Sequence, residues 1–254
     1  DGPDVEDCVE AYLGFARSIR IVDETYLPGL LARTPVVFEG AQGVLLDEWH
    51  GFHPHTTWST TTTANPLALL AEAGADARRI GVVRSYTTRH GAGPFPTEAP
   101  GLAALLPEAH NGTHPWQGAF RVGHLDLVAH RYALAATGGV DSLVVTHADR
   151  AAHVRRCTAY TDPQGRPLEL VPGEAPAPSH PLHPAPAPLD ARADAHLRRQ
   201  AALTGALSTA RPVLADGPTP PEAIAEALGT PLEAVFSGPT RTDARLTAPA
   251  RSSP

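Results

Sequence analysis

Short β-rich runs alternate with helical segments along most of this chain, and several of these runs end in a glycine or polar loop. Valine-rich and other β-type residues mark the runs at 36–39, 80–88, 141–149, 154–161 and 231–243. Apolar residues recur every three or four positions elsewhere, which predicts helices within 5–33 (two short ones), 64–79, 125–138, 193–207 and 220–230. Strands that alternate with helices predict an α/β fold with a mainly parallel central sheet and flanking helices, whose glycine loops lie at the ligand-binding edge.

The pattern divides the chain into four regions: a helical segment at 1–34, a sheet core at 35–170, a proline-rich excursion at 171–190, and C-terminal helices with a last glycine loop at 191–254. The excursion has no hydrophobic period, so we expect it to be extended and poorly ordered. We expect the tail from 248 to be frayed.

Charge and residue usage exclude several functions. The net charge of −7 gives no electrostatic reason for binding nucleic acid or an anionic membrane. No apolar run approaches 18 residues and no signal peptide opens the chain, so we expect a cytoplasmic protein. All 20 basic residues are arginine, which excludes a phosphate-loop lysine and a Schiff-base lysine. The chain has no methionine, so we expect it to begin inside a longer reading frame.

Two segments near the first predicted strand carry groups that can hold a polar ligand. FEGAQG at 38–43 brings a strand into a glycine turn, where Gln42 offers a donor and an acceptor. The segment 50–63 is dense in hydroxyl groups and includes Thr57. Alternatively, the first segment only turns the chain and the second is a solvated surface loop. The three histidines of this segment do not predict a metal site, because proline separates them and no matching carboxylate follows.

Three later loops follow predicted strands. TTRHGAGPFPTE at 87–98 can bring an arginine and backbone N–H groups to one anion. THAD at 146–149 ends a strand with Asp149, which can either accept two hydrogen bonds from a guanine edge or cap the next helix. FSGPTR at 236–241 is another strand-to-glycine loop.

The order of these motifs, from EGAQG through GAGPFPTE to the final SGP, resembles adenylosuccinate synthetase over nearly all of the chain. The resemblance implies a truncated version of that family's phosphate-loop-NTPase-like fold, and a ligase that joins IMP to aspartate while splitting GTP with Mg²⁺. It implies IMP contacts by Gln42, Thr57 and the backbone at His90. It also implies a GTP site formed by His147, Asp149, Ser237 and Gly238.

The chain departs from the family pattern in three places. His147 stands where the family has a lysine beside the guanine. In the loop that aligns with the family's amino-acid loop, residues 110–123, Gly118 and Phe120 replace two expected arginines, which leaves Thr113, His114 and Arg121 as its polar candidates. The family's N-terminal phosphate loop is absent. We therefore expect catalytic residues and Mg²⁺ ligands outside this chain, and no synthetase activity from the chain alone.

Three hypotheses remain open: a divergent adenylosuccinate synthetase supplied as a fragment, a paralogue that couples a different amine to a purine nucleotide, and a non-catalytic nucleotide-binding partner or remnant. The resemblance implies a homodimer in each enzymatic case.

Overall fold

A computed structural model describes residues 4–108, 111–175 and 191–247. The described residues form two compact units, one within 1–39 and 66–77 and the other within 40–65 and 78–254. Of the predicted proline-rich excursion, 171–175 has no regular secondary structure, and 176–190 lies outside the described residues. The predicted frayed tail from 248 also lies outside them.

The first unit contains the two predicted short helices, α1 (Val5–Ser18) and α2 (Tyr26–Leu31), and most of α3 (Ala64–Glu72). Asp4 caps α1, because its carboxylate accepts a hydrogen bond from the Glu6 N–H at 3.1 Å. The third helix is shorter than the predicted 64–79. Gly74 adopts a left-handed φ of 64° and the Ala75 N–H bonds to the Leu70 carbonyl at 2.9 Å, which ends the helix before the two arginines.

The predicted strand at 36–39 is wrong. These residues form neither helix nor strand, and the side chains of Val37 and Phe38 are 88% and 36% exposed. An apolar run forms a strand only where a neighbouring strand completes its backbone hydrogen bonds. The sequence of the run itself does not show whether such a neighbouring strand exists.

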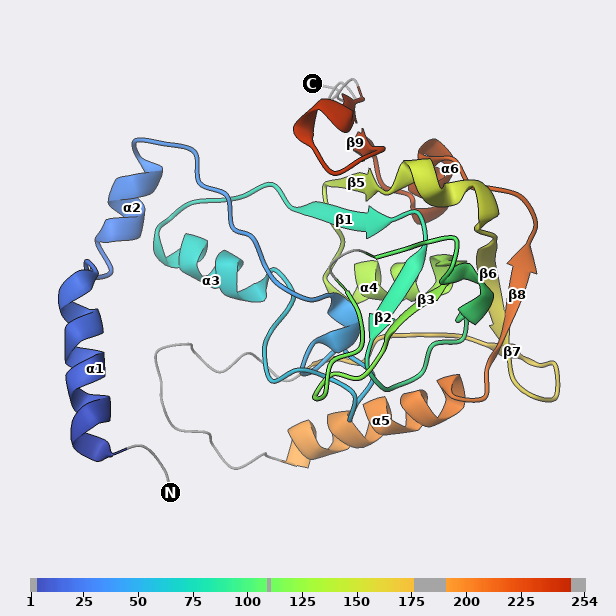
Figure 1. The fold of residues 1–254 in the computed structure, drawn as a ribbon, viewed down its shortest axis with the longest axis horizontal. Coiled ribbons are helices and arrows are strands. Elements are labelled where there is room, and N and C mark those ends of the chain that lie inside the picture. Colours follow the sequence, from blue (N-terminus) through green and yellow to red (C-terminus); the bar gives the residue numbers. More distant parts are fainter. Residues whose placement is uncertain (1–3, 109–110, 176–190, 248–254) are drawn as a thin grey trace. The chain divides into compact units, whose positions relative to one another are not determined.

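The second unit contains the central sheet, with strand order β1-β5-β9-β10. Figure 1 labels β1, β5 and β9 of this sheet. Its strands are β1 (Ile80–Arg84), β5 (Ser142–Thr146), β9 (Leu232–Phe236) and β10 (Ala244–Leu246). The first three are parallel, and β10 runs antiparallel to β9. The prediction of a mainly parallel sheet is therefore confirmed, and the carboxyl ends of β1, β5 and β9 lie at one edge.

The second unit also contains two other sheets. The predicted run 80–88 divides into β1 and β2 (Thr87–His90), and β2 pairs antiparallel with β3 (Phe120–Gly123). A further sheet is built on β6 (Arg156–Thr161), which pairs parallel with β4 (Leu125–Asp126) and antiparallel with β7 (Pro167–Leu168) and β8 (Arg211–Ala215).

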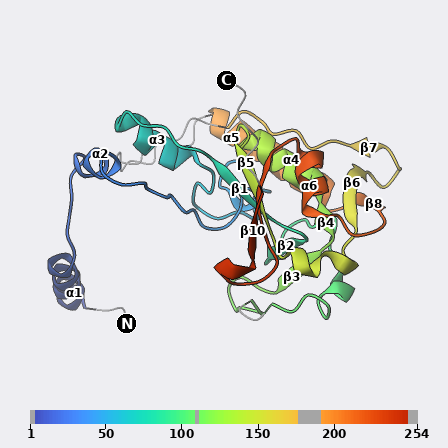
Figure 2. The ribbon, with the colours of Figure 1, turned by 90° about the horizontal axis from the view of Figure 1, so that it is seen from above.

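The remaining helices are α4 (Leu127–Ala136), α5 (Ala191–Leu207) and α6 (Pro221–Leu228), with 3-10 turns η1 (Val44–Leu46), η2 (Pro100–Leu102), η3 (Ala148–His153) and η4 (Arg241–Asp243). Figure 2 shows α4 and α6 next to each other. One apolar core joins Leu143 and Val145 of β5 to Ile224 of α6, all at most 1% exposed. Burial of these side chains fixes the sheet that carries the candidate site.

Candidate functional site

Three loops follow the carboxyl ends of β1, β5 and β9, the edge of a parallel sheet at which ligands usually bind. The first two loops are joined, because the Ser85 hydroxyl donates to the carbonyl of His147 at 2.6 Å. Asp149 follows in η3, and Ser237 and Gly238 follow β9. The fold therefore brings to one sheet edge the four residues for which the resemblance implies a GTP site.

Asp149 keeps an open carboxylate. Its side chain is 44% exposed, and its partner among the described residues is Arg150, with Nε 3.8 Å from the carboxylate. The turn η3 begins at Ala148 after the left-handed His147 (φ 57°), so Asp149 lies inside the turn rather than at its capping position. Both carboxylate oxygens remain able to accept hydrogen bonds from a ligand.

The loop after β9 is held in shape by Asp243. Its carboxylate accepts hydrogen bonds from the N–H and hydroxyl of Thr240, at 2.9 and 2.6 Å, and its carbonyl accepts one from the Ser237 N–H at 3.1 Å. A Cβ on Gly238 would lie 2.7 Å from the Asp243 carboxyl carbon, so a larger residue here would displace the Asp243 side chain. The exposed Ser237 is thus presented on a fixed turn.

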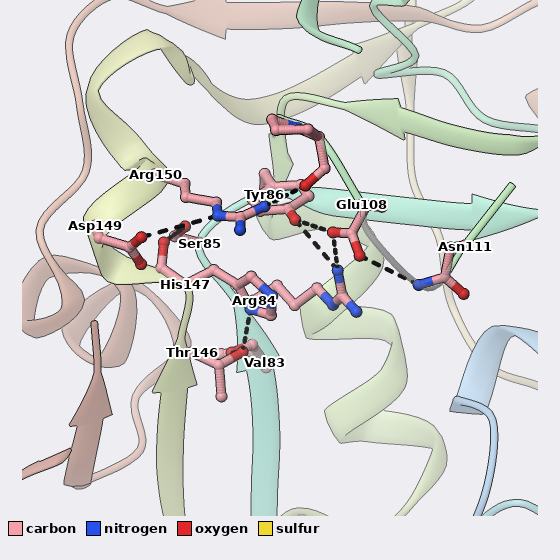
Figure 3. A network of polar contacts seen from close by, with 11 residues as sticks. Val83, Arg84, Ser85, Tyr86, Glu108, Asn111, Thr146, His147, Asp149 and Arg150 are labelled. Atoms are coloured by element: carbon pink, nitrogen blue, oxygen red, sulfur yellow. Dashed lines mark hydrogen bonds and ion pairs between the residues drawn. The ribbon is translucent and has the colours of Figure 1, made fainter. Parts of the chain in front are cut away.

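Next to this edge lies a polar network centred on Glu108 (Figure 3). Glu108 accepts hydrogen bonds from the buried Tyr86 hydroxyl, from Arg84 Nη1 at 2.7 Å and from Asn111 Nδ2 at 3.1 Å. The ring of His147 meets Tyr86 edge-on, with centroids 5.5 Å apart. The sequence pattern does not predict this network, whose one signal in the sequence is a lone carboxylate after the apolar stretch 102–106.

The network fixes the charge states of its members. Burial raises the pKa of Tyr86, and the hydrogen bond to Glu108 raises it further. Burial would also raise the pKa of Glu108, but the Tyr86 hydrogen bond and the positive charge of Arg84 outweigh it, so that pKa is lowered. Burial and the charge of Arg84 lower the pKa of His147. At neutral pH the site therefore has a charged glutamate and a neutral histidine.

The hydroxyl-rich segment is organised by Asp47, which is 1% exposed. One carboxylate oxygen accepts hydrogen bonds from the backbone N–H groups of Trp49 and His50, at 2.9 and 3.0 Å, and the other accepts one from Thr61 at 2.7 Å. A buried carboxylate with three such donors holds the two ends of the segment together. The sequence pattern alone does not predict this role of Asp47.

Gln42 and Thr57, the predicted IMP contacts, are on segments joined by this arrangement. Gln42 is exposed and adopts a left-handed φ of 62°. The carbonyl of its neighbour Gly43 accepts a hydrogen bond from the Thr61 hydroxyl at 3.1 Å. The Thr57 hydroxyl is 2.7 Å from that of Ser59. The two predicted residues thus belong to one folded segment.

His90, the third predicted IMP contact, ends β2. Its ring meets Phe120 edge-on at 5.7 Å, and its Nε2 is enclosed without a hydrogen-bond partner among the described residues. The following Gly91 has φ 86°, and its N–H donates to the carbonyl of Ala119 at 3.0 Å. A Cβ on Gly91 would lie 2.4 Å from the Gln117 carbonyl oxygen. The loop that begins at Gly91, called the glycine loop below, therefore touches the amino-acid loop, backbone to backbone.

The described part of the amino-acid loop, 111–123, comprises a tight hairpin followed by β3. His114 and Gly118 exchange backbone hydrogen bonds at 2.9 and 2.8 Å, and Nδ1 of His114 accepts one from the Trp116 N–H at 3.2 Å. Thr113 is exposed, and the Trp116 side chain at the tip is 91% exposed. The Nδ1 atom of His114 is thus an acceptor here, and the hairpin presents an aromatic surface.

The guanidinium of Arg121 is fully engaged in contacts with other residues of the protein. Its Nε and Nη2 bind the carboxylate of Glu98 as a fork, and its Nη1 donates to the carbonyls of Gly91 and Gly93, each at 3.0 Å. Its guanidinium also lies 5.3 Å from the ring centre of Phe95. The hydrogen bond from Arg121 lowers the pKa of Glu98. All three guanidinium nitrogens have partners, so Arg121 fastens the glycine loop in this structure.

The described residues contain no group of three or more His, Cys, Asp or Glu side chains placed to hold a metal ion. Within the same residues, no helix is both long and apolar enough to cross a membrane. Burial raises the pKa of Cys157 to about 12, which makes this thiol unreactive at neutral pH.

A family model described as adenylosuccinate synthetase matches residues 2–183. The chain belongs to the adenylosuccinate synthetase family. The match includes the hydroxyl-rich segment, the glycine loop, the amino-acid loop and Asp149, whereas Ser237 and Gly238 lie beyond it.

Curated adenylosuccinate synthetases are similar to this chain over part of their length. The protein of Trichormus variabilis is 38% identical over 173 residues, which cover 62% of this chain and 37% of that protein. The protein of Synechococcus elongatus is 37% identical over 188 residues, 68% of this chain and 40% of that protein. The chain thus spans about two fifths of the length of these adenylosuccinate synthetases.

Two solved structures share the fold. Fully ligated adenylosuccinate synthetase from Plasmodium falciparum superposes with a TM-score of 0.71 and 22% identity, over 98% of this chain and 59% of that one. Succinoaminodeoxyadenylate synthetase of cyanophage S-2L, bound to dGMP and dATP, gives a TM-score of 0.50 and 22% identity, over 90% and 51%. The likeness to the Plasmodium structure includes nearly the whole chain, so the adenylosuccinate synthetase fold extends beyond residue 183.

Proposed function

We propose that this chain is the C-terminal part of an adenylosuccinate synthetase-type ligase of purine biosynthesis. In its complete form the protein joins the purine nucleotide IMP to an amine and splits GTP. The observation that carries the proposal is the meeting of an open carboxylate, Asp149, with the fixed turn at Ser237 and Gly238 at the carboxyl edge of the parallel sheet.

Asp149 supplies base selectivity in this proposal. Guanine presents two donors, N1–H and the exocyclic amine, and an ionised carboxylate can accept both. Adenine presents an unprotonated N1 at the same place, so a carboxylate there is repelled. The neutral ring of His147, held edge-on to Tyr86, and the exposed Ser237 complete the walls around the base.

The second nucleotide, IMP, is assigned to the folded segment of Gln42 and Thr57 and to the backbone at His90. The left-handed Gln42 projects from an exposed turn, and the Thr57 hydroxyl has only one hydroxyl neighbour among the described residues. Both therefore keep donor and acceptor capacity for a polar ligand. The complete ligase is proposed to act as a homodimer, as the resemblance implies.

No group of three or more His, Cys, Asp or Glu side chains in the described part of the chain is placed to hold a metal ion, and the resemblance implies that the Mg²⁺ ligands lie in the family's N-terminal part. We therefore assign the Mg²⁺ ligands and the catalytic acid and base to residues outside this chain. Phosphoryl transfer needs positioned cationic groups around the phosphates, so the isolated chain should release no GDP from GTP.

One observation in the amino-acid loop favours an amine other than aspartate as the second substrate. Arg121, the one arginine in 111–123, is fully engaged by Glu98 and by two carbonyls. The exposed Trp116 adds an apolar surface. A second carboxylate on the amine would lose hydration at this loop without gaining a charged partner.

A substrate screen of the complete protein tests the proposal. The protein would be mixed with Mg²⁺, GTP, IMP and a panel of amines that includes aspartate, and GDP release and product mass would be measured. GDP release that requires both IMP and one amine supports the ligase. Binding of GTP and IMP without product for any amine would instead support a non-catalytic nucleotide-binding partner.

A further inference from the structure

Arg89 is a buried guanidinium without a carboxylate partner among the described residues. It lies on β2 and is 7% exposed. Its Nε donates to the carbonyl of Ala92 at 2.8 Å, and its Nη2 donates to the carbonyl of His55 at 2.9 Å. Carbonyl oxygens satisfy these two N–H groups, but they do not neutralise the positive charge.

The neighbouring charged residues add to the uncompensated positive charge around Arg89. Arg121 is the direct cross-strand partner of Arg89 on β3, and the neighbouring carboxylate, Glu98, is bound to Arg121. Like charges on facing positions of neighbouring strands destabilise a sheet. Burial and the charge of Arg121 lower the pKa of Arg89 to about 10, so it remains charged at neutral pH. Within the described residues, the pair therefore has two cations and one anion.

The guanidinium keeps donors for a further partner. An arginine has five N–H donors, and the two carbonyls use one on Nε and one on Nη2. Nη1 has no hydrogen-bond partner among the described residues, and it is not one of the enclosed polar atoms. The two nitrogens Nη1 and Nη2 thus retain three N–H groups, enough to bind two oxygens of one oxyanion.

Gly93 makes room for this side chain. A Cβ at position 93 would lie 2.4 Å from Nη2 and 2.8 Å from Cζ of Arg89, and 2.8 Å from Cβ of His55. The glycine loop and the hydroxyl-rich segment therefore approach each other from two sides of the same guanidinium. Each segment carries residues assigned above to IMP.

We propose that Arg89 binds an oxyanion of a substrate where the glycine loop meets the hydroxyl-rich segment. The anion is either the phosphate of the purine nucleotide or a carboxylate of the amine, because both present two oxygens in the geometry that a guanidinium binds. The assignment to a substrate rests on the proposed function. Binding of a simple oxyanion at Arg89 does not depend on the proposed function.

Titration of the 254-residue chain with inorganic phosphate and with acetate, by calorimetry at low ionic strength, tests the site. Arg89→Gln should weaken binding of the preferred anion about tenfold or more, and Arg89→Lys should weaken it less. Arg245→Gln is the matched control, since it removes an equal charge from an exposed ion pair with Glu222. Absence of saturable binding of either anion, or equal affinity in Arg89→Gln, would overturn the proposal.

Glu98→Gln provides an independent test if Arg89→Gln does not fold. It removes the one neighbouring negative charge of the described residues, so phosphate or acetate should bind more tightly. An unchanged or weaker affinity in a folded Glu98→Gln chain would contradict the proposal. Because Glu98→Gln also releases Nε and Nη2 of Arg121, the gain is measured again with Arg121→Gln added. A gain that persists supports the proposal, and a gain that is lost belongs to Arg121 and contradicts it.

Binding of IMP, inosine and aspartate by the Arg89→Gln variant distinguishes the two sources of the anion. If Arg89→Gln weakens binding of IMP but not of inosine, the anion is the nucleotide phosphate. If it weakens binding of aspartate and spares IMP, the anion is the carboxylate of the amine. A complete protein that binds phosphate through Arg89 but makes no ligation product would contradict the proposed function and leave this inference standing.

Discussion

At the carboxyl end of β5, Asp149 has a 44% exposed carboxylate whose partner among the described residues is 3.8 Å away, whereas the guanidinium of Arg121 is divided between Glu98 and two glycine carbonyls. The sequence marks both residues as ligand contacts. Only the first is free to make such contacts in this structure. A charged residue in a family motif can therefore serve a ligand in one loop and the fold in another, and its existing partners decide which.

Arg121→Ala should have the largest effect on stability. It removes the fork to Glu98 and leaves the carbonyls of Gly91 and Gly93 unpaired, so the free energy of unfolding should fall by about 3 kcal/mol. Urea unfolding followed by tryptophan fluorescence measures the change.

Arg198→Ala is the control for that experiment, because it removes an exposed pair with Asp194 within α5, where the arginine side chain is 78% exposed. It should change stability by less than about 0.5 kcal/mol. An equally small change for Arg121→Ala would mean that its guanidinium is free for a ligand after all.

Asp149→Asn should leave the fold intact and weaken GTP binding by the complete protein. The amide cannot accept both guanine donors, so the loss should be about 1.5–3 kcal/mol, or roughly tenfold to a hundredfold in Kd. Asp141→Asn, at the amino end of β5 with the same side-chain exposure of 44%, is the matched control and should leave GTP affinity unchanged. Equal GTP affinities for the two variants would remove Asp149 from the site.

Gly91→Ala should destabilise the protein, because the new Cβ would press on the Gln117 carbonyl and φ is 86°. We expect a loss of about 1–2 kcal/mol. At Gly43, no atom lies within 4 Å of the added Cβ and φ is −149°, so Gly43→Ala should be neutral or slightly stabilising. Thermal unfolding of the two variants compares the loops directly. Similar melting temperatures would show that the glycine loop is not held against the hairpin.

The smallest effect concerns pH. Burial lowers the pKa of His147 in the folded protein, so below about pH 6.5 the unfolded chain takes up a proton that the folded site resists. This contribution to stability is complete above pH 6.5 and is lost as the pH falls toward the folded pKa. His147→Gln should therefore reduce the loss of stability between about pH 6.5 and 5, and the difference from the parent chain should be constant from about pH 7 to 8. A pH-independent difference across the whole range would contradict this.

The alternation of strands and helices was enough to predict the fold class, because β5 and β9 are apolar runs whose burial forces them into a covered parallel sheet. The local sequence pattern gave wrong predictions where a distant pairing partner or a single backbone angle determines the secondary structure. The run 36–39 has strand residues but forms no strand, and Gly74 ends α3 before Arg78.

The candidate site was predictable to a similar extent. Asp149 and Ser237 were located because they directly follow strands, and the topology then brings their loops to one edge. The commitment of Arg121 to Glu98 was not predictable, since the two residues are 23 positions apart and meet through the pairing of β2 and β3. Asp47 and Glu108 were missed for the same reason, because their roles depend on contacts that spacing does not encode.

The most direct test is the KM for aspartate of the complete protein, measured beside that of the Trichormus variabilis enzyme with IMP and GTP saturating. If the amino-acid loop no longer holds a second carboxylate, the KM should be about tenfold to a hundredfold higher than that of the relative, because a missing charged hydrogen-bond partner costs about 1.5–3 kcal/mol. A KM in the same range as the relative's would contradict the account and show that aspartate is held by a cation outside this loop.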